Sequence, residues 1–383
     1  MSRTASFLSA SERTLPARSP APEDIVGSVA PRLAQVERMF RDNLSSPVTI
    51  VGEIGEFVAA GSGKRVRPTL HLLACDLCGY AGPHDVTLAT VLEFIHSATL
   101  IHDDVIDDAA TRRGRPSVNR RWGNTITVLF GDYLYAKAME LALQAGSLKV
   151  MDRLAWITLR MTEGEMLQTR YAGRLDLPMA DYLGLIERKT AVLFGGCCEL
   201  AGILAEVDDV VEERLRQYGV QMGMAFQIVD DLLDFTGDPA VLGKPTASDL
   251  REGKVTLPVI DLLERDTPGA RSLVERIVAG DAGPEDGAAL TAMLHEAGAI
   301  ERAEGRKLSQ VVRIVYIGHV ADDQAPGVAG REAIIPAAVC VDPRELFRKR
   351  GIASKQRTIL TRRAVIFPRW GVELLHRFVS LNW

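Results

Sequence analysis

The chain has 383 residues, of which 47% are hydrophobic and 25% are charged, and its formal net charge is −5 at pH 7. This globular composition allows one large domain or two average ones, and nothing in the charge indicates a nucleic-acid partner. Five cysteines, an odd number, argue against a disulfide framework, and no segment reaches the apolar length that a membrane span requires.

Residues 1–24 are rich in Ser, Ala, Pro and Arg and lack the apolar centre of a secretory signal. We expect a disordered leader here, with an organellar transit peptide as the alternative. A helical pattern begins near Ala30, where apolar residues recur at steps of three and four. Cys75 and Cys78 have the spacing of half a zinc site, but no second pair follows. We therefore expect small buried side chains, in keeping with a reducing cytoplasm.

Long helical stretches follow, and runs with strict alternation of β-branched residues are almost absent. The predicted stretches run from Val86 to Asp108, Ile126 to Gln144, Met151 to Tyr171, Met179 to Ala205, Val210 to Phe235 and Val255 to Glu264. Breaks that contain Gly or Pro separate them, as at 114–116, 173–178 and 237–243. The pattern predicts an all-α bundle of about ten helices packed as one domain.

An acidic motif lies near the end of the stretch 86–108. It is spaced as Asp103-Asp104-x-x-Asp107. Residues four apart share a helix face, so Asp103 and Asp107 project together, and such like charges are costly to bury unless cations neutralise them. Carboxylate oxygens are the ligands that Mg²⁺ prefers and shares with substrate phosphates. An acidic helix end in solvent explains a single motif equally well.

The same motif recurs as Asp230-Asp231-x-x-Asp234, in a frame of apolar side chains. A solvated acidic face rarely has such neighbours, so the repeat favours the metal site. Two such motifs on facing helices would hold a diphosphate between them.

Cationic residues accompany both motifs. Three lie in the turn 63–68, three lie in the turn 112–115, and single lysines stand at positions 189, 244 and 254. Arginine forks suit phosphate oxygens, and lysine supplies a mobile point charge. Basic turns are usually just surface, so their coincidence with paired acids is what indicates a phosphate site. His96 lies two helical turns before Asp103 on the same face, where contact with substrate and packing in the core remain equal alternatives.

These blocks resemble those of the trans-prenyl diphosphate synthase (polyprenyl synthetase) family, from about Ile25 to Arg306. The residues that carry the resemblance are Gly63 to Pro68, His96 to Asp107, Arg112 to Asn119, Phe130 to Tyr133, Lys189-Thr190, Ala225 to Asp234 and Gly253-Lys254. The resemblance implies an isoprenoid-synthase-type helical bundle around a deep central cavity. It also implies a catalytic domain at 25–307 and, usually, a homodimer.

Carried over position by position, the resemblance implies about three Mg²⁺ ions on an allylic diphosphate. Their ligands would be Asp103, Asp104, Asp107, Asp230, Asp231 and Asp234. Arg112, Lys189, Lys244 and Lys254 would bind the same diphosphate. Lys64, Arg67, His96 and Arg113 would bind isopentenyl diphosphate, and Thr190 and Gln227 would line the reacting end.

The implied reaction condenses farnesyl or geranyl diphosphate with isopentenyl diphosphate through an allylic carbocation, from which water must be excluded. Product length depends on the residues just before Asp103, because one helical turn, about 5.4 Å, spans roughly one isoprene unit. Short-chain members of the family have an aromatic floor there, whereas this sequence has Ala98 and Thr99. The small residues predict a long product, and the resemblance to the long-chain branch of the family implies an all-trans chain of about seven to ten units, a quinone side-chain precursor. A stop deeper in, at Phe130 or Met139, is the alternative.

Three other functions remain open. A synthase of farnesyl or geranylgeranyl diphosphate is disfavoured by the small residues before the first motif. A terpene cyclase normally has a second motif based on Asn, Ser and Glu. A non-catalytic regulatory partner subunit of a heteromeric synthase loses its aspartates, whereas this chain keeps all six.

Residues 308–383 do not continue the helical pattern. From Ser309 to Trp383 the chain carries 12 Lys and Arg against 6 Asp and Glu, so the rest of the chain has a net charge of −11. We expect a poorly packed basic tail of unknown fold; an unrelated extension or a shifted reading frame would explain it. Its basic and aromatic side chains would allow peripheral contact of a cytoplasmic protein with an anionic membrane surface.

Overall fold

The computed structural model describes residues 22–61, 63–112, 114–238, 246–283 and 285–306. Helix α1 (Pro22–Asp42) begins just ahead of Ile25, where we expected the domain to start. Most of the expected leader (1–21) and the whole expected tail (308–383) lie outside the described residues. The expectations about both termini therefore stay predictions.

The expected all-α architecture is confirmed, because the described elements are almost entirely helical. After α1 come α2 (Thr49–Ala59), α3 (Val66–Leu77), α4 (Asp85–Ile106), α5 (Val118–Trp122), α6 (Asn124–Leu143) and α7 (Leu148–Tyr171). Next are α8 (Met179–Ile186), the π-helical turn η1 (Glu187–Ala191), α9 (Val192–Leu204) and α10 (Asp209–Thr236). Then follow α12 (Ser248–Arg251), α13 (Leu257–Glu264), α14 (Ala270–Ala279), α15 (Asp286–Glu296) and helical residues 299–306.

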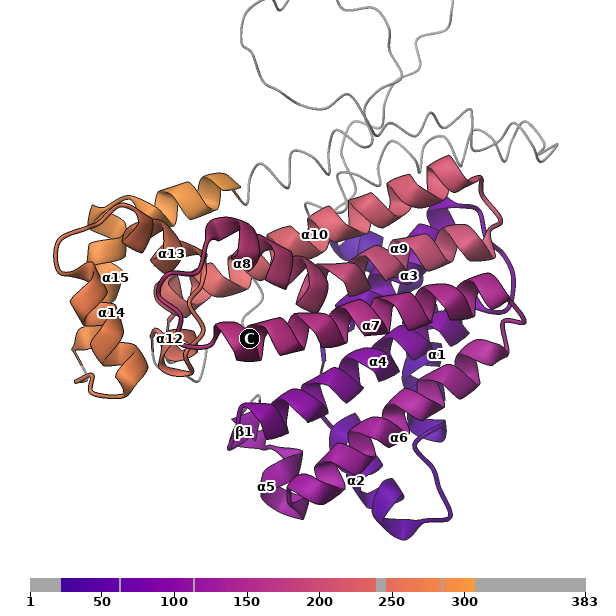
Figure 1. The fold of residues 1–383 in the computed structure, drawn as a ribbon. Coiled ribbons are helices and arrows are strands. Elements are labelled where there is room, and N and C mark those ends of the chain that lie inside the picture. Colours follow the sequence, from indigo (N-terminus) through magenta and orange to yellow (C-terminus); the bar gives the residue numbers. More distant parts are fainter. Residues whose placement is uncertain (1–21, 62, 113, 239–245, 284, 307–383) are drawn as a thin grey trace, which may run out of the picture.

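The long helices α4, α6, α7, α9 and α10 run side by side, and the short helices α12 to α15 gather beside α8 at one end (Figure 1). A two-residue antiparallel ladder, β1 (Thr111–Arg112) with β2 (Arg115–Pro116), follows the end of α4. Gly114 adopts φ +71° between the two strands, a conformation that favours glycine. The tight turn brings the chain back against the end of α4.

Local signals explain where the long helices begin and how closely they pack. The Ser147 side chain accepts a hydrogen bond from the Val150 N–H and caps α7, and Asp208 caps α10 in the same way. A Cβ atom at Gly219 would lie 2.2 Å from the Phe194 carbonyl O. Only glycine therefore lets α9 and α10 approach to this distance.

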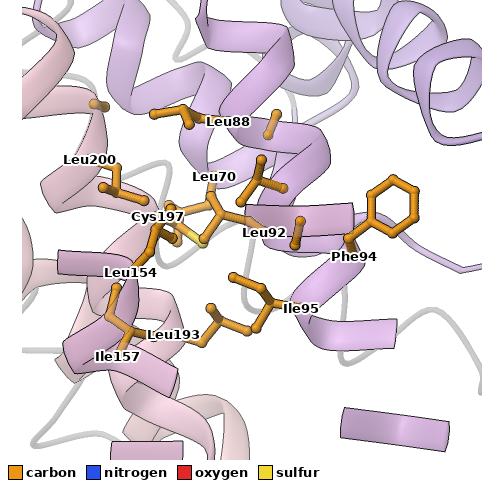
Figure 2. Packing of buried hydrophobic residues seen from close by; sticks show 14 of the residues in the cluster. Leu70, Leu88, Leu92, Phe94, Ile95, Leu154, Ile157, Leu193, Cys197 and Leu200 are labelled. Carbon is orange, nitrogen blue, oxygen red and sulfur yellow. The ribbon is translucent and has the colours of Figure 1, made fainter. Parts of the chain in front are cut away.

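Apolar side chains fill the space between these helices. Figure 2 shows residues of α3, α4, α7 and α9 meeting in the larger of two buried clusters, among them Leu70, Leu92, Ile157 and Leu193. The second cluster joins α8 and α10 to the short helices α12 to α15. The two clusters hold together the long helices that surround the site described below.

The four cysteines that the structure describes are free thiols in this apolar interior. Burial raises the pKa of the Cys197 thiol to about 12, so it stays protonated. The expectation of small buried side chains at Cys75 and Cys78 is confirmed. Among the described residues, no helix has the length and apolar character needed to cross a bilayer.

Candidate active site

A cavity of about 1600 Å³ lies between α4, α7, η1, α10 and the segment 252–256. Both aspartate motifs reach it. Asp103 and Asp107 enter from α4, and Asp230, Asp231 and Asp234 enter from α10. The deep cavity expected from the sequence is present, and it joins the two motifs in space.

The first motif occupies the C-terminal end of α4, where its members point in different directions. Asp103 and Asp107 line the cavity, as the four-residue spacing predicts. Asp104 is only 2% exposed and accepts a hydrogen bond of 2.7 Å from Arg112 Nε. Its backbone carbonyl accepts a second bond, of 3.0 Å, from Asn119 Nδ2. Asp104 thus ties the β1 and α5 segments to the end of α4.

Two lysines from distant parts of the chain stand beside this motif. Lys189 Nζ lies 2.6 Å from Glu165 Oε2 and 3.8 Å from Asp103 Oδ2. Lys254 Nζ lies 2.9 Å from Asp107 Oδ2, although in sequence it follows the second motif. Burial works against the charge of Lys254, but Asp107 and a neighbouring glutamate outweigh burial and raise its pKa. Both lysines therefore lie beside the carboxylates of the first motif.

Lys254 is placed by a close approach between two loops. Gly253 adopts φ +80°, and its carbonyl O accepts a hydrogen bond of 2.8 Å from the N–H of Gly173, which follows α7. A Cβ at Gly253 would lie 3.2 Å from that nitrogen. Glycine at this position therefore serves to deliver the neighbouring lysine to the cavity.

The second motif lies within the last turns of α10 and is held by neutral donors. Asp231 is 3% exposed; it accepts a hydrogen bond from the Tyr182 hydroxyl and another, of 2.9 Å, from Gln227 Nε2. Asp234 accepts a bond of 2.6 Å from Ser248 Oγ. Asp230 lines the cavity, and it is the more exposed member of this motif.

A π-helical turn orients two further residues of the site. The extra residue in η1 places Lys189 and Thr190 together on the cavity wall. Thr190 Oγ1 donates a hydrogen bond of 2.8 Å to Gln227 Oε1, which leaves Gln227 Nε2 to donate to Asp231. A Cβ at Gly164 would lie 2.6 Å from the Lys189 backbone N, so α7 can pack against this turn only through glycine.

The cavity carries an excess of buried carboxylate. Burial, with Glu165 and Asp107 adding to it, raises the pKa of Asp103 to about 6, although Lys189 and Arg112 oppose the rise. Burial also raises the pKa of Asp231 to about 8. Both shifts show that added positive charge would stabilise the ionised carboxylates.

Oxygen ligands of this kind fit hard divalent cations that are shared with phosphate groups. Within the described residues, no three side chains are close enough together to form a complete metal site. Asp103, Asp107 and Asp230 instead line the same cavity, where substrate oxygens can complete the coordination of an ion. The donor set therefore fits a divalent metal ion bound together with a diphosphate.

The basic turn 63–68 divides its three cations between two tasks. Lys64 and Arg67 line the cavity. Arg65 adopts φ 51° and forms ion pairs at 2.5 Å with both Glu37 and Glu93. These two carboxylates of the protein itself therefore neutralise its charge. His96 also lines the cavity, which favours contact with substrate over simple core packing.

The part of the cavity beyond the charged groups is lined by smaller and apolar side chains. Ala98 and Thr99 of α4 both line it, and the Thr99 hydroxyl donates to the His96 carbonyl O at 2.8 Å. The alternative stops Phe130 and Met139 do not line it. Room therefore exists below Asp103 along α4.

Two predicted site residues, Arg113 and Lys244, lie outside the described residues. Sequence reasoning missed three residues that contact the aspartates or their lysine: Tyr182, Ser248 and Glu165. No motif marks them. Only Tyr182 offers a sequence signal, as a polar side chain within the largely apolar helix α8.

Comparison with known proteins assigns the chain to a family. A model of the "Polyprenyl synthetase" family matches residues 48–296. The octaprenyl diphosphate synthase of Escherichia coli (strain K12) is 38% identical over 256 residues, which cover 67% of this chain and 79% of that protein.

Solved structures agree with this match. A polyprenyl synthase from Caulobacter crescentus CB15, complexed with calcium and isoprenyl diphosphate, superposes with a TM-score of 0.73 at 35% identity and covers 79% of this chain and 92% of its own. A decaprenyl diphosphate synthase from Rhodobacter capsulatus gives a TM-score of 0.73 at 33% identity, with 91% and 98% covered.

Proposed function

Because the chain belongs to the polyprenyl synthetase family, we propose that it condenses an allylic diphosphate with successive isopentenyl diphosphates. The product is a long all-trans polyprenyl diphosphate. The observation that carries the proposal is the meeting of both aspartate motifs, Lys189 and Lys254 in one cavity. Residues 25–307 form the catalytic unit, and the family match at 48–296 lies inside them.

The charged residues of the cavity bind the allylic diphosphate. Asp103, Asp107 and Asp230 would hold Mg²⁺ ions, which would act as Lewis acids on the allylic diphosphate. Lys189 and Lys254 bind the same diphosphate and stabilise the negative charge that grows on it as the C–O bond breaks. Arg112 contributes through Asp104, which it holds in place, and through its own position on the cavity wall.

The second substrate binds next to the first. Lys64, Arg67 and His96 bind the isopentenyl diphosphate and hold its double bond beside the allylic carbon, where it attacks the carbocation. Thr190 and Gln227 line the reacting end and, by hydrogen bonding to each other, exclude water from the cation. A proton then leaves, most simply to the departing diphosphate, and the chain is one unit longer.

The same test separates this function from the alternatives. Purified protein is incubated with Mg²⁺, farnesyl diphosphate and labelled isopentenyl diphosphate, and the extracted products are resolved by chain length. Products of about seven or more units are expected, because Ala98 and Thr99 leave the wall open along several turns of α4. Products of three or four units would identify a short-chain synthase. No product, with binding of substrate retained, would identify a regulatory subunit.

We also propose a homodimer. Large apolar side chains are exposed on the outer surfaces of α6 and α7, where a second copy would cover them. They are Leu129, Leu143, Leu148 and Met166.

Light scattering tests the dimer. Leu129→Arg places a charge on this surface and should shift the protein to a monomer. Val210→Arg is the matched control, because Val210 is equally exposed (58%) but lies at the start of α10. A wild-type monomer, or dimers in both variants, would contradict the proposed interface.

A further inference from the structure

Arg65 stands between two cations that line the cavity, Lys64 and Arg67, but its own side chain is bound to carboxylates of the protein. Its Nε and one terminal nitrogen donate to the two carboxylate oxygens of Glu37, at 2.5 and 3.2 Å. The other terminal nitrogen donates to Glu93 Oε1 at 2.5 Å. All three guanidinium nitrogens therefore have a carboxylate partner, which a substrate diphosphate would have to displace.

The backbone at Arg65 depends on its surroundings as well. Arg65 adopts φ 51° and ψ 39°, a left-handed conformation that is costly for a residue other than glycine. Its carbonyl O accepts hydrogen bonds from the Thr69 N–H at 3.0 Å and from the Thr69 hydroxyl at 2.8 Å, and α3 begins at the next residue. A strained conformation persists only where surrounding contacts determine it. The ion pairs of the Arg65 side chain are such contacts, so the path of the turn depends on them.

Helix α1 supplies much of the support for Arg65. Glu37 belongs to α1, and so does Phe40, whose ring centroid lies 5.5 Å from the guanidinium carbon of Arg65. Phe40 is buried, and its ring packs against that of Phe94 of α4 at a centroid distance of 4.4 Å. Helix α1 lies against α3 and α4 (Figure 1), and it precedes residues 48–296, which the family model matches. A turn on the cavity wall thus depends on a helix outside the matched residues.

We propose that Arg65 is a positioning residue through which Glu37 of α1 determines the affinity for isopentenyl diphosphate. The ion pairs hold the turn in the conformation in which Lys64 and Arg67 both line the cavity. Cations that the fold already holds in place lose little conformational freedom when a diphosphate binds, so they bind it more tightly. This inference rests on the proposed function, because it concerns the second substrate of that reaction.

Steady-state kinetics of Arg65→Ala test the inference, with the concentration of each substrate varied in turn. The KM for isopentenyl diphosphate should rise about tenfold or more, because the turn loses its fixed conformation. The KM for farnesyl diphosphate should change little, since Lys189 and Lys254, which are proposed to bind the allylic diphosphate, belong to other segments. Turnover at saturating isopentenyl diphosphate should change less than this KM. Equal changes in both KM values would contradict a role confined to the turn.

Glu37→Gln distinguishes a positioning role from direct contact between Arg65 and the substrate. The substitution keeps the size of the side chain and removes the charge that pairs with Arg65. If Arg65 acts through its ion pairs, the KM for isopentenyl diphosphate rises in this variant as it does in Arg65→Ala. If Arg65 bound the diphosphate itself, the released guanidinium would bind it more tightly and the KM would fall. An unchanged or lower KM in Glu37→Gln therefore overturns the inference.

Arg32→Ala is the matched control for a general loosening of α1. Arg32 also joins α1 to α3 and α4, through ion pairs with Asp76 at 2.6 Å and with Asp85 at 3.1 Å. None of these three described residues lines the cavity. The KM for isopentenyl diphosphate should therefore equal that of the wild type. A rise similar to that of Arg65→Ala would overturn the inference, because the effect would then belong to the packing of α1 in general.

The outcomes distinguish this inference from the proposed function. If the wild type forms no prenylated product, the proposed function fails. If the wild type forms product and neither Arg65→Ala nor Glu37→Gln raises the KM for isopentenyl diphosphate, the function stands and the inference is overturned. If Arg65→Ala fails to fold, Glu37→Gln decides the question, because the Glu37 side chain is 32% exposed and its substitution disturbs the interior less.

Discussion

The first aspartate motif stands at the end of a helix among cations, whereas the second stands within the last turns of a helix among hydroxyl and amide groups. Arg112 and Lys254 contact Asp104 and Asp107. Asp231 and Asp234 instead take their hydrogen bonds from uncharged side chains of other elements. Identical spacing in the sequence therefore leads to two different electrostatic environments.

The position along the helix explains the difference. The C-terminal end of α4 carries a partial negative charge of its own, so carboxylates there need cations, and the loop that follows can supply them. Asp231 lies between packed helices, where donors that cost less to bury are available at Tyr182 and Gln227. Asp103 and Asp230, one from each motif, both line the cavity.

The largest effect on turnover is expected from substitution of the cavity-lining aspartates, which both motifs provide. Asp103→Asn and Asp230→Asn should each lower kcat by about 10²–10³-fold, because each removes a charge that faces the diphosphate. Thermal unfolding should be followed in both variants, so that a loss of turnover is not mistaken for a loss of fold. Steady-state assays with labelled isopentenyl diphosphate measure the loss. Near-normal turnover in either variant would show that the motifs are not a joint binding site.

The next effect separates the motifs by stability. Arg112→Ala leaves the buried carboxylate of Asp104 without its charged partner and should cost about 2–3 kcal/mol of unfolding free energy. Tyr182→Phe removes a neutral donor from Asp231 and should cost about 1 kcal/mol. Urea unfolding measures both, with Arg120→Ala as a control, because Arg120 only reaches exposed Asp108 at 3.8 Å. If Arg112→Ala and Tyr182→Phe lost the same unfolding free energy, the proposed electrostatic difference between the two motifs would be wrong.

The motifs also affect the pH dependence of stability. The pKa of Asp231 rises from 3.8 to about 8 on folding because the carboxyl is buried. The folded state therefore binds more protons than the unfolded state across this range, and stability falls as pH rises from about 4 to about 8, by up to about 1.4 kcal/mol per unit. Asp103, with a pKa near 6, acts in the same direction over a narrower range.

Unfolding at pH 5.5 and 7.5 in the presence of a chelator measures this dependence. Asp231→Asn cannot titrate, so the loss of stability between the two pH values should be smaller than in the wild type. A variant with the full wild-type dependence would mean that other groups cause it.

The smallest energetic effect concerns the residues that precede each motif. Four residues before Asp230 stands Phe226, which lines the cavity, whereas four and five residues before Asp103 stand Thr99 and Ala98. Ala98→Phe makes the first motif resemble the second and should shorten the product while turnover is kept. Chromatography of the dephosphorylated products measures it. An unchanged distribution would mean that the chain does not run along α4.

The sequence was sufficient for the bundle and for the cavity-facing aspartates, because helical periodicity and the four-residue spacing are local properties. It was insufficient for Asp104, whose burial depends on Arg112 and Asn119 folding back from the next segment. The sequence does not distinguish the three cations of the turn 63–68, but in the structure Arg65 forms ion pairs with Glu37 and Glu93. Such pairing depends on contacts across the fold, which no local pattern contains.

In the predicted helical stretch from Met179 to Ala205, too, local sequence predicts only part of the structure, because the rest depends on contacts with other helices. It is helical throughout, as expected, but it is interrupted by η1. Helix propensity does not distinguish an α turn from a π turn. The close packing of Gly164 against the Lys189 backbone accompanies the change, and Gly164 belongs to another helix.

The π turn has a consequence for insertions and deletions. A π turn is an α-helix that has accepted one extra residue, so deletion of Arg188 would restore a continuous helix from α8 to α9. The deletion would also rotate one half against the other by about 100°, the angle between successive residues. Lys189 could then face the cavity only if α8 and Tyr182 turned away from Asp231. The number of residues in this segment, as well as their identity, thus decides which side chains reach the substrate.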